Sequence, residues 1–217
     1  MGDSSSDFLY PFLQEEPARS LEAVLSGLQA STLQKAGEVA RMRTDFWCHY
    51  GDALVAAATA LAGVFASGGQ LLTFGNGGSA TDAQDAAADL VNPGPGRRPL
   101  PAVCLANDIG VVTGVGNDVG FDNVFTRQII AFGREGDAVL GFSTSGESRN
   151  VTTGLERAQS MGLRTIGITG YDGGKMARLG LDHCLIVHST YIPRIQEVHA
   201  TIYHTLWALV HERLNAS

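Results

Sequence analysis

The chain has 217 residues, of which 44% are hydrophobic and 17% charged, an ordinary balance for one globular domain able to bury a core. Its net charge of -7 argues against a broad surface for nucleic acid or anionic membranes, because such surfaces need clustered Lys and Arg. The chain shows neither a secretory signal at its start nor an uninterrupted apolar run of about 18 residues, so a cytoplasmic protein is expected.

The first 30 residues are expected to form an N-terminal extension, partly flexible, ahead of a domain over residues 31–217. From residue 20 to about residue 65, apolar residues recur at helical spacing, which predicts two or three helices. The middle of this segment carries a wide apolar stripe made of Val39, Met42, Phe46, Trp47 and Tyr50. We expect a helix this apolar to pack on a second copy of the chain.

From residue 70 onward, short β-rich runs alternate with helical stretches. Strands are predicted in QLLTFG, AVCLA, AVLGFS, RTIGITG and HCLIVH, and helices over 79–91, 121–131, 149–161, 175–179 and 194–214. Because the strands are unalternated and separated by helices, the pattern is typical of a parallel sheet covered on both faces. In such sheets ligands bind beyond the carboxyl ends of the strands.

One of these strand ends carries a glycine-rich loop. Gly75, Asn76, Gly77, Gly78 and Ser79 stand directly between a strand and a helix. Glycines allow close backbone approach, and a helix start offers free N–H groups to an anion. A simple tight turn capped by Ser79 would explain the same residues. The loop is neither the GxGxxG dinucleotide pattern nor a Walker motif, so a nucleotide-binding domain is disfavoured.

A second strand end is rich in hydroxyl groups. Ser143, Thr144, Ser145 and Ser148 are compressed into six residues ahead of a helix. Converging hydroxyls and amides suit a phosphate monoester, whereas a capped helix start would need only one hydroxyl. A third loop around residues 117–122 offers Asp118, which could orient sugar hydroxyls or cap the next helix.

Five motifs carry a family resemblance: GNGGSATDAQ, VGNDVGFDNVFTRQI, REGDAVLGFSTSGES, TGYDGGKMA and RIQEVHATIYH. In order and approximate spacing they resemble the phosphoheptose isomerase family, a branch of the SIS (sugar isomerase) domain proteins, over roughly residues 35–214. The resemblance implies an α/β fold of three α-β-α layers with a five-stranded parallel flavodoxin-like sheet. It also implies N-terminal helices used in a homotetramer, with active sites between subunits.

The reaction implied by the resemblance converts sedoheptulose 7-phosphate to D-glycero-D-manno-heptose 7-phosphate. By the same resemblance, a set of hydroxyl residues binds the phosphate, and two further residues face the sugar. The phosphate set is Ser79, Ser143, Thr144, Ser145 and Ser148, joined by the backbone of Gly77 and Gly78, and the sugar set is Asn76 and Asp118, with Gln196 as a further contact.

Aldose–ketose isomerisation needs a base to remove a proton beside the carbonyl and an acid to protonate the oxygen, and it passes through an enediol. The resemblance places these roles on Asp89 and His204. His199, close to them in the last motif, is interpreted as a structural residue.

Relatives of this family often bind zinc through a His and a Glu on the helix after GNGGS and through a Gln and a His on the last helix. Gln196 and His204 keep the second pair, whereas Asp85 and Asp89 stand at the His and Glu positions. Like charges at i and i+4 repel by about 0.2–0.5 kcal/mol on an isolated helix, and a cation would offset this. The set suits Zn²⁺ or a harder metal such as Mn²⁺. The alternative is a solvated acidic face that binds no metal.

Two functions therefore remain open from the sequence. The first is an isomerase acting on a seven-carbon sugar phosphate. The second is a non-catalytic phosphosugar-binding or protein-binding module of the same fold, such as a protein that associates with the replication initiator. Both would use the phosphate loops, so the acidic residues on the helix and the histidine decide between them.

Overall fold

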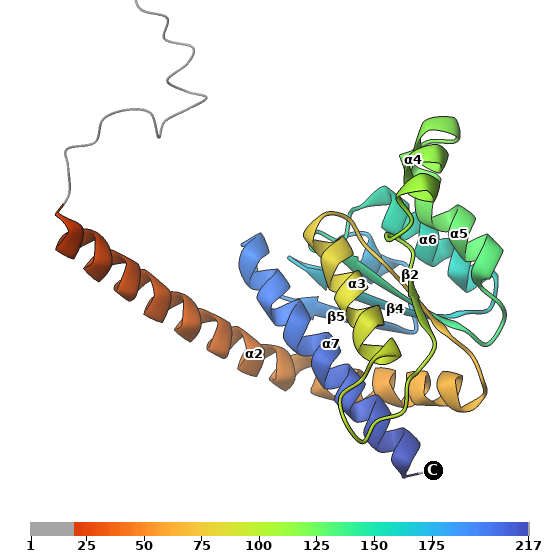
Figure 1. Cartoon of the computed structure of the whole chain (residues 1–217), viewed down its shortest axis with the longest axis horizontal. Helices are drawn as coiled ribbons and strands as arrows, with labels where there is room; N and C mark the ends of the chain where they lie inside the picture. Colours follow the sequence, from red (N-terminus) through yellow and green to blue (C-terminus); the bar gives the residue numbers. More distant parts are fainter. Residues whose placement is uncertain (1–19, 217) are drawn as a thin grey trace, which may run out of the picture. The chain divides into compact units, whose positions relative to one another are not determined.

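The computed structural model describes residues 20–216, so most of the predicted N-terminal extension lies outside the described residues. The chain divides into two compact units, residues 1–40 and residues 41–217. Helix α2, Leu21–Ala66, runs through the boundary between them as one element (Figure 1). The prediction of two or three helices here was therefore wrong. Gly51 lies inside this helix, and a Cβ there would approach the Trp47 ring to 3.3 Å.

The second unit is built on a five-stranded sheet with the order β2-β1-β3-β4-β5, and every pairing in it is parallel. The strands are β1 (Leu71–Phe74), β2 (Ala102–Cys104), β3 (Ala138–Ser143), β4 (Arg164–Gly170) and β5 (His183–Val187). All of them were predicted from the sequence. The order is that of the flavodoxin-like sheet, whose strand order reverses between β1 and β3.

Helices cover both faces of the sheet, which confirms the predicted three-layer α-β-α fold (Figure 1). On one face, residues of α2 after residue 41 pack with α3 (Gly78–Val91) and α7 (Ile192–Asn215). On the other face lie α5 (Val124–Phe132) and α6 (Arg149–Ser160). Strand residues alternate between the two cores: Leu140 and Phe142 face α3 and α7, and Val139 faces the other side.

Some connections differ from the prediction. The third loop, expected around residues 117–122, begins inside a helix that was not predicted, α4 (Ile109–Asp118), and a 3₁₀ turn, η2 (Phe121–Asn123), follows it. The predicted helix over 175–179 is a second 3₁₀ turn, η3 (Met176–Arg178). The α4 sequence escaped detection because its three glycines lower helix propensity and its apolar residues show no buried face.

One 18-residue window of α2 is long and apolar enough to cross a membrane, with a mean hydropathy of 1.3. However, 44% of that window is buried inside the protein. Leu54, Leu61 and Phe65 belong to the core that α2 shares with the sheet. Burial of these residues in the hydrophobic core accounts for much of the apolar composition of this window.

Candidate active site

The two predicted phosphate loops lie at the carboxyl ends of β1 and β3, the neighbouring strands between which the strand order reverses. In a doubly wound sheet, this switch point is where ligands bind. Each loop leads directly into a helix: residues 75–77 into α3, and residues 144–148 into α6. Both loops therefore lie at the same edge of the sheet and end at the N-terminus of a helix, where the dipole favours an anion.

Neither helix start is capped by a side chain. The N-cap residue of α3 is Gly77, with φ of 55°, and that of α6 is Ser148, and neither makes a side-chain cap hydrogen bond. The alternative in which Ser79 caps the first helix is therefore wrong, since Ser79 lies inside α3 and is buried. In the first turn of α3, the N–H groups of Ser79, Ala80 and Thr81 donate to backbone carbonyls of the preceding loop, and in α6 the Val151 N–H donates to Oδ1 of Asn150. What the two helix starts offer an anion is therefore mainly the positive end of the helix dipole.

Hydrogen bonds hold the two loops together. The side chains of Asn76 and Asn150 form two hydrogen bonds. Nδ2 of Asn76 donates to Oδ1 of Asn150, and Nδ2 of Asn150 donates to Oδ1 of Asn76, each at 2.8 Å. Within the second loop, the Ser143 hydroxyl donates to the Ser148 hydroxyl at 3.0 Å. Asn150, buried in the first turn of α6, was missed by the sequence analysis, and no local pattern marks it.

The second loop is fixed by a close approach of the backbone. Gly146 has φ of 68°, and a Cβ there would lie 2.1 Å from the Gly173 carbonyl oxygen. The Gly146 N–H donates to the Ser143 carbonyl at 3.0 Å, and the Met176 N–H donates to the Gly146 carbonyl at 3.0 Å. The turn after β4 therefore supports this loop from behind.

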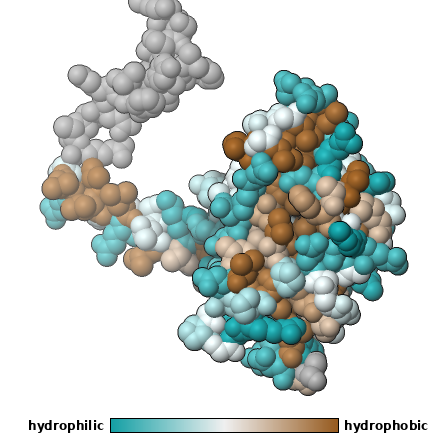
Figure 2. Space-filling view, turned by 45° about the vertical axis from the view of Figure 1, so that its right-hand side comes forward, coloured by the Kyte–Doolittle hydropathy of each residue, from teal (hydrophilic) through white to brown (hydrophobic). Residues whose placement is uncertain are grey.

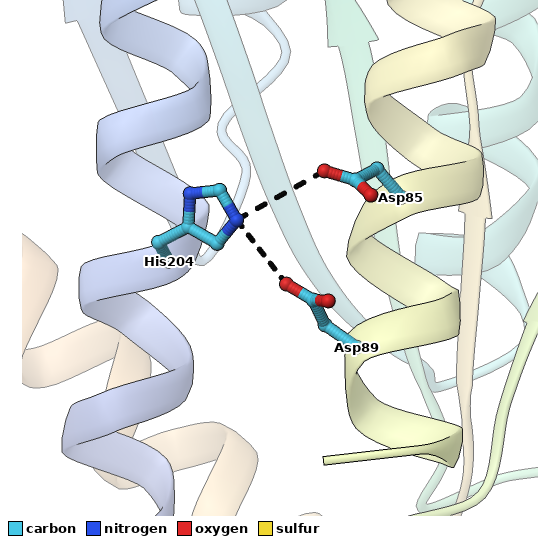
Figure 3. Close-up of side chains that lie close together, drawn as sticks. All are labelled: Asp85, Asp89 and His204. Carbon is cyan, nitrogen blue, oxygen red and sulfur yellow. Dashed lines mark ion pairs between the residues drawn. The ribbon is translucent and has the colours of Figure 1, made fainter. Parts of the chain in front are cut away.

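Asp85, Asp89 and His204 meet between α3 and α7 (Figure 3). The two carboxylates lie one turn apart on α3, as their spacing predicted, and the imidazole reaches them from α7. Nε2 of His204 lies 3.2 Å from Oδ2 of Asp89 and 3.9 Å from Oδ2 of Asp85. One ligand-type atom from each residue lies within 4.8 Å of the other two.

These separations fit a cation. Zinc sits about 2.0–2.2 Å from nitrogen and oxygen ligands, which places two ligands of a tetrahedral site roughly 3.3–3.6 Å apart. The observed 3.2 Å and 3.9 Å bracket that range. The set of two carboxylates and one imidazole could hold zinc or a harder divalent metal.

Gln196 belongs to α7, but its side chain lies against the first residue of α3 and not among these three side chains. A Cβ on Gly78 would stand 1.9 Å from Nε2 of Gln196, so the glutamine covers the first residue of α3. Its side chain also hydrogen-bonds Asp82. Burial is the main cause that raises the pKa of Asp82 to about 6; the charge of Asp85 adds to it, and the Gln196 bond opposes it.

Tyr203 was missed by the sequence analysis although it touches this group. Its hydroxyl donates to Oδ2 of Asp85 at 2.6 Å, and its ring packs on His204 with centroids 4.5 Å apart. Burial, followed by the contact with Asp85 and the neighbouring carboxylates, raises the pKa of Tyr203, so the phenol stays protonated. Its position directly before His204 was the only available signal.

Asp118 is the last residue of α4 and is exposed. Within residues 20–216, it is not joined by a hydrogen bond or an ion pair to the other predicted site side chains; its Oδ1 accepts from Asn117 at 2.9 Å. Nearby, Asp122 pairs at 3.3 Å with Arg149, the first residue of α6. The third loop thus contacts the start of α6 through Asp122.

Comparison with known proteins agrees with this architecture. The family model that matches the chain is that of the SIS domain, over residues 29–170. A phosphoheptose isomerase of Geobacter sulfurreducens is 50% identical over 155 residues, which cover 71% of this chain and 82% of that protein. One of Aquifex aeolicus is 43% identical over 176 residues, which cover 81% of this chain and 92% of that protein.

A solved structure of phosphoheptose isomerase from Neisseria gonorrhoeae superposes with a TM-score of 0.80 at 36% identity, covering 85% of this chain and 99% of that one. The chain therefore belongs to the phosphoheptose isomerase family of SIS domain proteins. This membership confirms the family resemblance and the prediction of an enzyme of the isomerase class.

Proposed function

We propose that the chain interconverts sedoheptulose 7-phosphate and D-glycero-D-manno-heptose 7-phosphate. The observation that carries this proposal is the group formed by Asp85, Asp89 and His204 on α3 and α7. A non-catalytic sugar-binding module would need the phosphate loops but would not need an acid and a base held together. The names of its relatives support the same reaction class.

The substrate phosphate would bind at the switch point between β1 and β3. The hydroxyls of Ser79, Ser143, Thr144, Ser145 and Ser148, with the backbone of Gly77 and Gly78, would surround it. The starts of α3 and α6 support this role, because the positive ends of their helix dipoles favour a phosphate dianion. Asn76, Gln196 and Asp118 would then contact the sugar.

Asp89 would act as the base that removes the proton beside the carbonyl, and His204 would protonate the oxygen, giving the enediol. The 3.2 Å between Nε2 of His204 and Oδ2 of Asp89 supports this assignment, since an acid and a base this close together could act on neighbouring atoms of one substrate. His204 and the Asp89 carboxylate are about half exposed, at 54% and 42%, so a bound sugar can reach them.

Asp85, Asp89 and His204 would hold the divalent metal that the family implies, and Gln196 would join them only if its side chain moved away from the start of α3. Such a cation, when bound, polarises a carbonyl or fixes the sugar hydroxyls. The spacing of the three side chains supports this assignment, and zinc is our first candidate. A carboxylate that ligates through one oxygen retains the other for proton transfer. Likewise, His204 would act as the acid only through the ring nitrogen that does not hold the metal.

We further propose that the protein is cytoplasmic and forms a homo-oligomer, a tetramer in keeping with the resemblance, in which the N-terminal helices pack between copies. Large apolar side chains on the first part of α2 support this, since Leu21, Leu25 and Leu28 are 57–74% exposed at helical spacing. Brown, hydrophobic areas also interrupt the hydrophilic surface in Figure 2. We also retain, as part of this proposal, the predicted division of the chain into an N-terminal extension over residues 1–30 and an SIS domain over residues 31–217.

The test compares two variants by turnover and by ligand binding. In Asp89→Asn, kcat should fall by about 10²–10⁴-fold while sugar phosphate still raises the melting temperature, because the phosphate loops are unchanged. In Ser143→Ala, which removes a phosphate hydroxyl, KM should rise about 10-fold. Ser160→Ala is the matched control, since that hydroxyl bonds Arg157 at the far end of α6. An Asp89→Asn variant with wild-type turnover would refute the assigned base.

A further inference from the structure

Tyr203 lies between the two helices that carry the candidate metal ligands. It belongs to α7, directly before His204, and is only 2% exposed. Its hydroxyl reaches across to α3 and donates to Oδ2 of Asp85 at 2.6 Å. A donor this close to a carboxylate makes one of the strong, charge-assisted hydrogen bonds.

The tyrosine ring is itself fixed by its neighbours. It packs edge-on against Phe142, with centroids 6.1 Å apart and planes at 87°. Phe142 is fully buried in β3, one residue before Ser143. The other side of the ring contacts the imidazole of His204, with centroids 4.5 Å apart. Tyr203, which packs against the sheet through Phe142, therefore touches two of the three candidate ligands, Asp85 and His204.

The ligands would otherwise have considerable freedom. The side chains of Asp85 and His204 are 55% and 54% exposed, so solvent alone would not hold either in one rotamer. Asp85 also lies on a helix face with Asp82 and Asp89, and repulsion among these carboxylates would turn it outward. A hydrogen bond to one of its oxygens opposes this and leaves lone pairs for a cation.

We propose that Tyr203 is a positioning residue that orients Asp85 and His204 for binding of a divalent cation. The inference rests on the metal site of the proposed function and deepens it. Partners of this outer kind fix the orientation of a ligand, and their loss typically weakens metal binding by about 10–100-fold. Tyr203 touches neither the sugar nor the metal in this account.

The experiment titrates Zn²⁺ and Mn²⁺ into the chelator-treated full chain by calorimetry. Tyr203→Phe keeps the ring and removes only the hydroxyl, and it should bind metal about 10–100-fold more weakly than wild type. Tyr50→Phe is the matched control, because that hydroxyl bonds His188, 3.2 Å away, outside the metal site. Its metal affinity should equal that of wild type even if its melting temperature falls.

A double-mutant cycle separates positioning from a general loss of structure. If Tyr203 acts through Asp85, then Tyr203→Phe should change the metal affinity of an Asp85→Asn protein by less than about 2-fold. An equal loss in both backgrounds would overturn the inference. Protection against heat by inorganic phosphate should be unchanged in Tyr203→Phe, since the loops remain intact.

The two levels of the proposal fail in different ways. Wild-type protein that binds metal with the same affinity as Tyr203→Phe overturns the inference and leaves the metal site standing. Wild-type protein that binds neither Zn²⁺ nor Mn²⁺ overturns the metal site and the role of Tyr203 together. In that second case, turnover by the chelator-treated wild type decides whether the isomerase proposal survives without a metal.

Discussion

His199 offers a quantitative test of how α7 is held against the sheet. It lies on α7 between Gln196 and His204 and is completely buried. Its Nε2–H donates to the Thr169 carbonyl at the end of β4, 3.1 Å away, and in the described part of the chain Nδ1 is buried without a hydrogen-bond partner. Burial lowers the pKa of His199 to about 4, although the bond to Thr169 opposes that change.

The sign of the pH effect follows from that pKa. The unfolded chain binds a proton at His199 below about pH 6.5, whereas the folded chain resists protonation until about pH 4. The free energy of unfolding should therefore fall as the pH drops from about 6.5 to about 4. The gap between the two pKa values corresponds to about 3 kcal/mol in all, of which about 2 kcal/mol is lost by about pH 5.

The perturbation is His199→Gln, which retains an N–H donor for Thr169 but does not titrate. Urea unfolding at about pH 7.5 and about pH 5, with chelator present, should show that wild type loses about 2 kcal/mol more than the variant on acidification. His49→Gln, at an exposed position on α2, should keep the wild-type pH dependence. If wild type and His199→Gln lose equal stability, His199 is not the buried neutral group described above.

Two further changes probe the surroundings of the site. Because the folded pKa of Asp82 is raised to about 6, its ionisation destabilises the fold as the pH rises above its unfolded value near 4. Asp82→Asn should therefore raise the melting temperature, measured by calorimetry, by about 2–4 °C at about pH 8 and leave it unchanged near pH 4. No gain in melting temperature at pH 8 would contradict the raised pKa of Asp82. Gly146→Ala should destabilise the fold by roughly 3 kcal/mol or more in urea, through positive φ and the clash with Gly173. Gly136→Ala, with φ of 92° and open space, should cost only about 1–2 kcal/mol, and an equal cost at both glycines would refute the close approach.

The sheet could be predicted from the sequence because each strand is a short apolar run bounded by loops and helices. Helix α4 could not, since Gly110, Gly114 and Gly116 weaken the helical signal. The continuity of α2 was not predicted either, because helical spacing over residues 20–65 indicates helical residues but does not say whether they form one helix or several.

In the candidate site, local spacing predicts which residues share a helix face, but it does not predict which helices bring their residues together. The i, i+4 spacing of Asp85 and Asp89 placed both on one helix face from sequence alone. Their meeting with His204 depends on how α3 and α7 lie side by side on the sheet (Figure 1), and only the family resemblance anticipated it. The bond from Tyr203 to Asp85 spans 118 positions, and no local pattern predicts such a contact.

The most direct test of the central claim is the conversion of sedoheptulose 7-phosphate by purified wild-type protein, followed by NMR with and without added Zn²⁺ or Mn²⁺. We expect the aldose signal to appear in the presence of metal and to disappear in Asp89→Ala and His204→Ala. Absence of turnover, with the sugar phosphate still protecting the fold against heat, would contradict it. The chain would then be a phosphosugar-binding module.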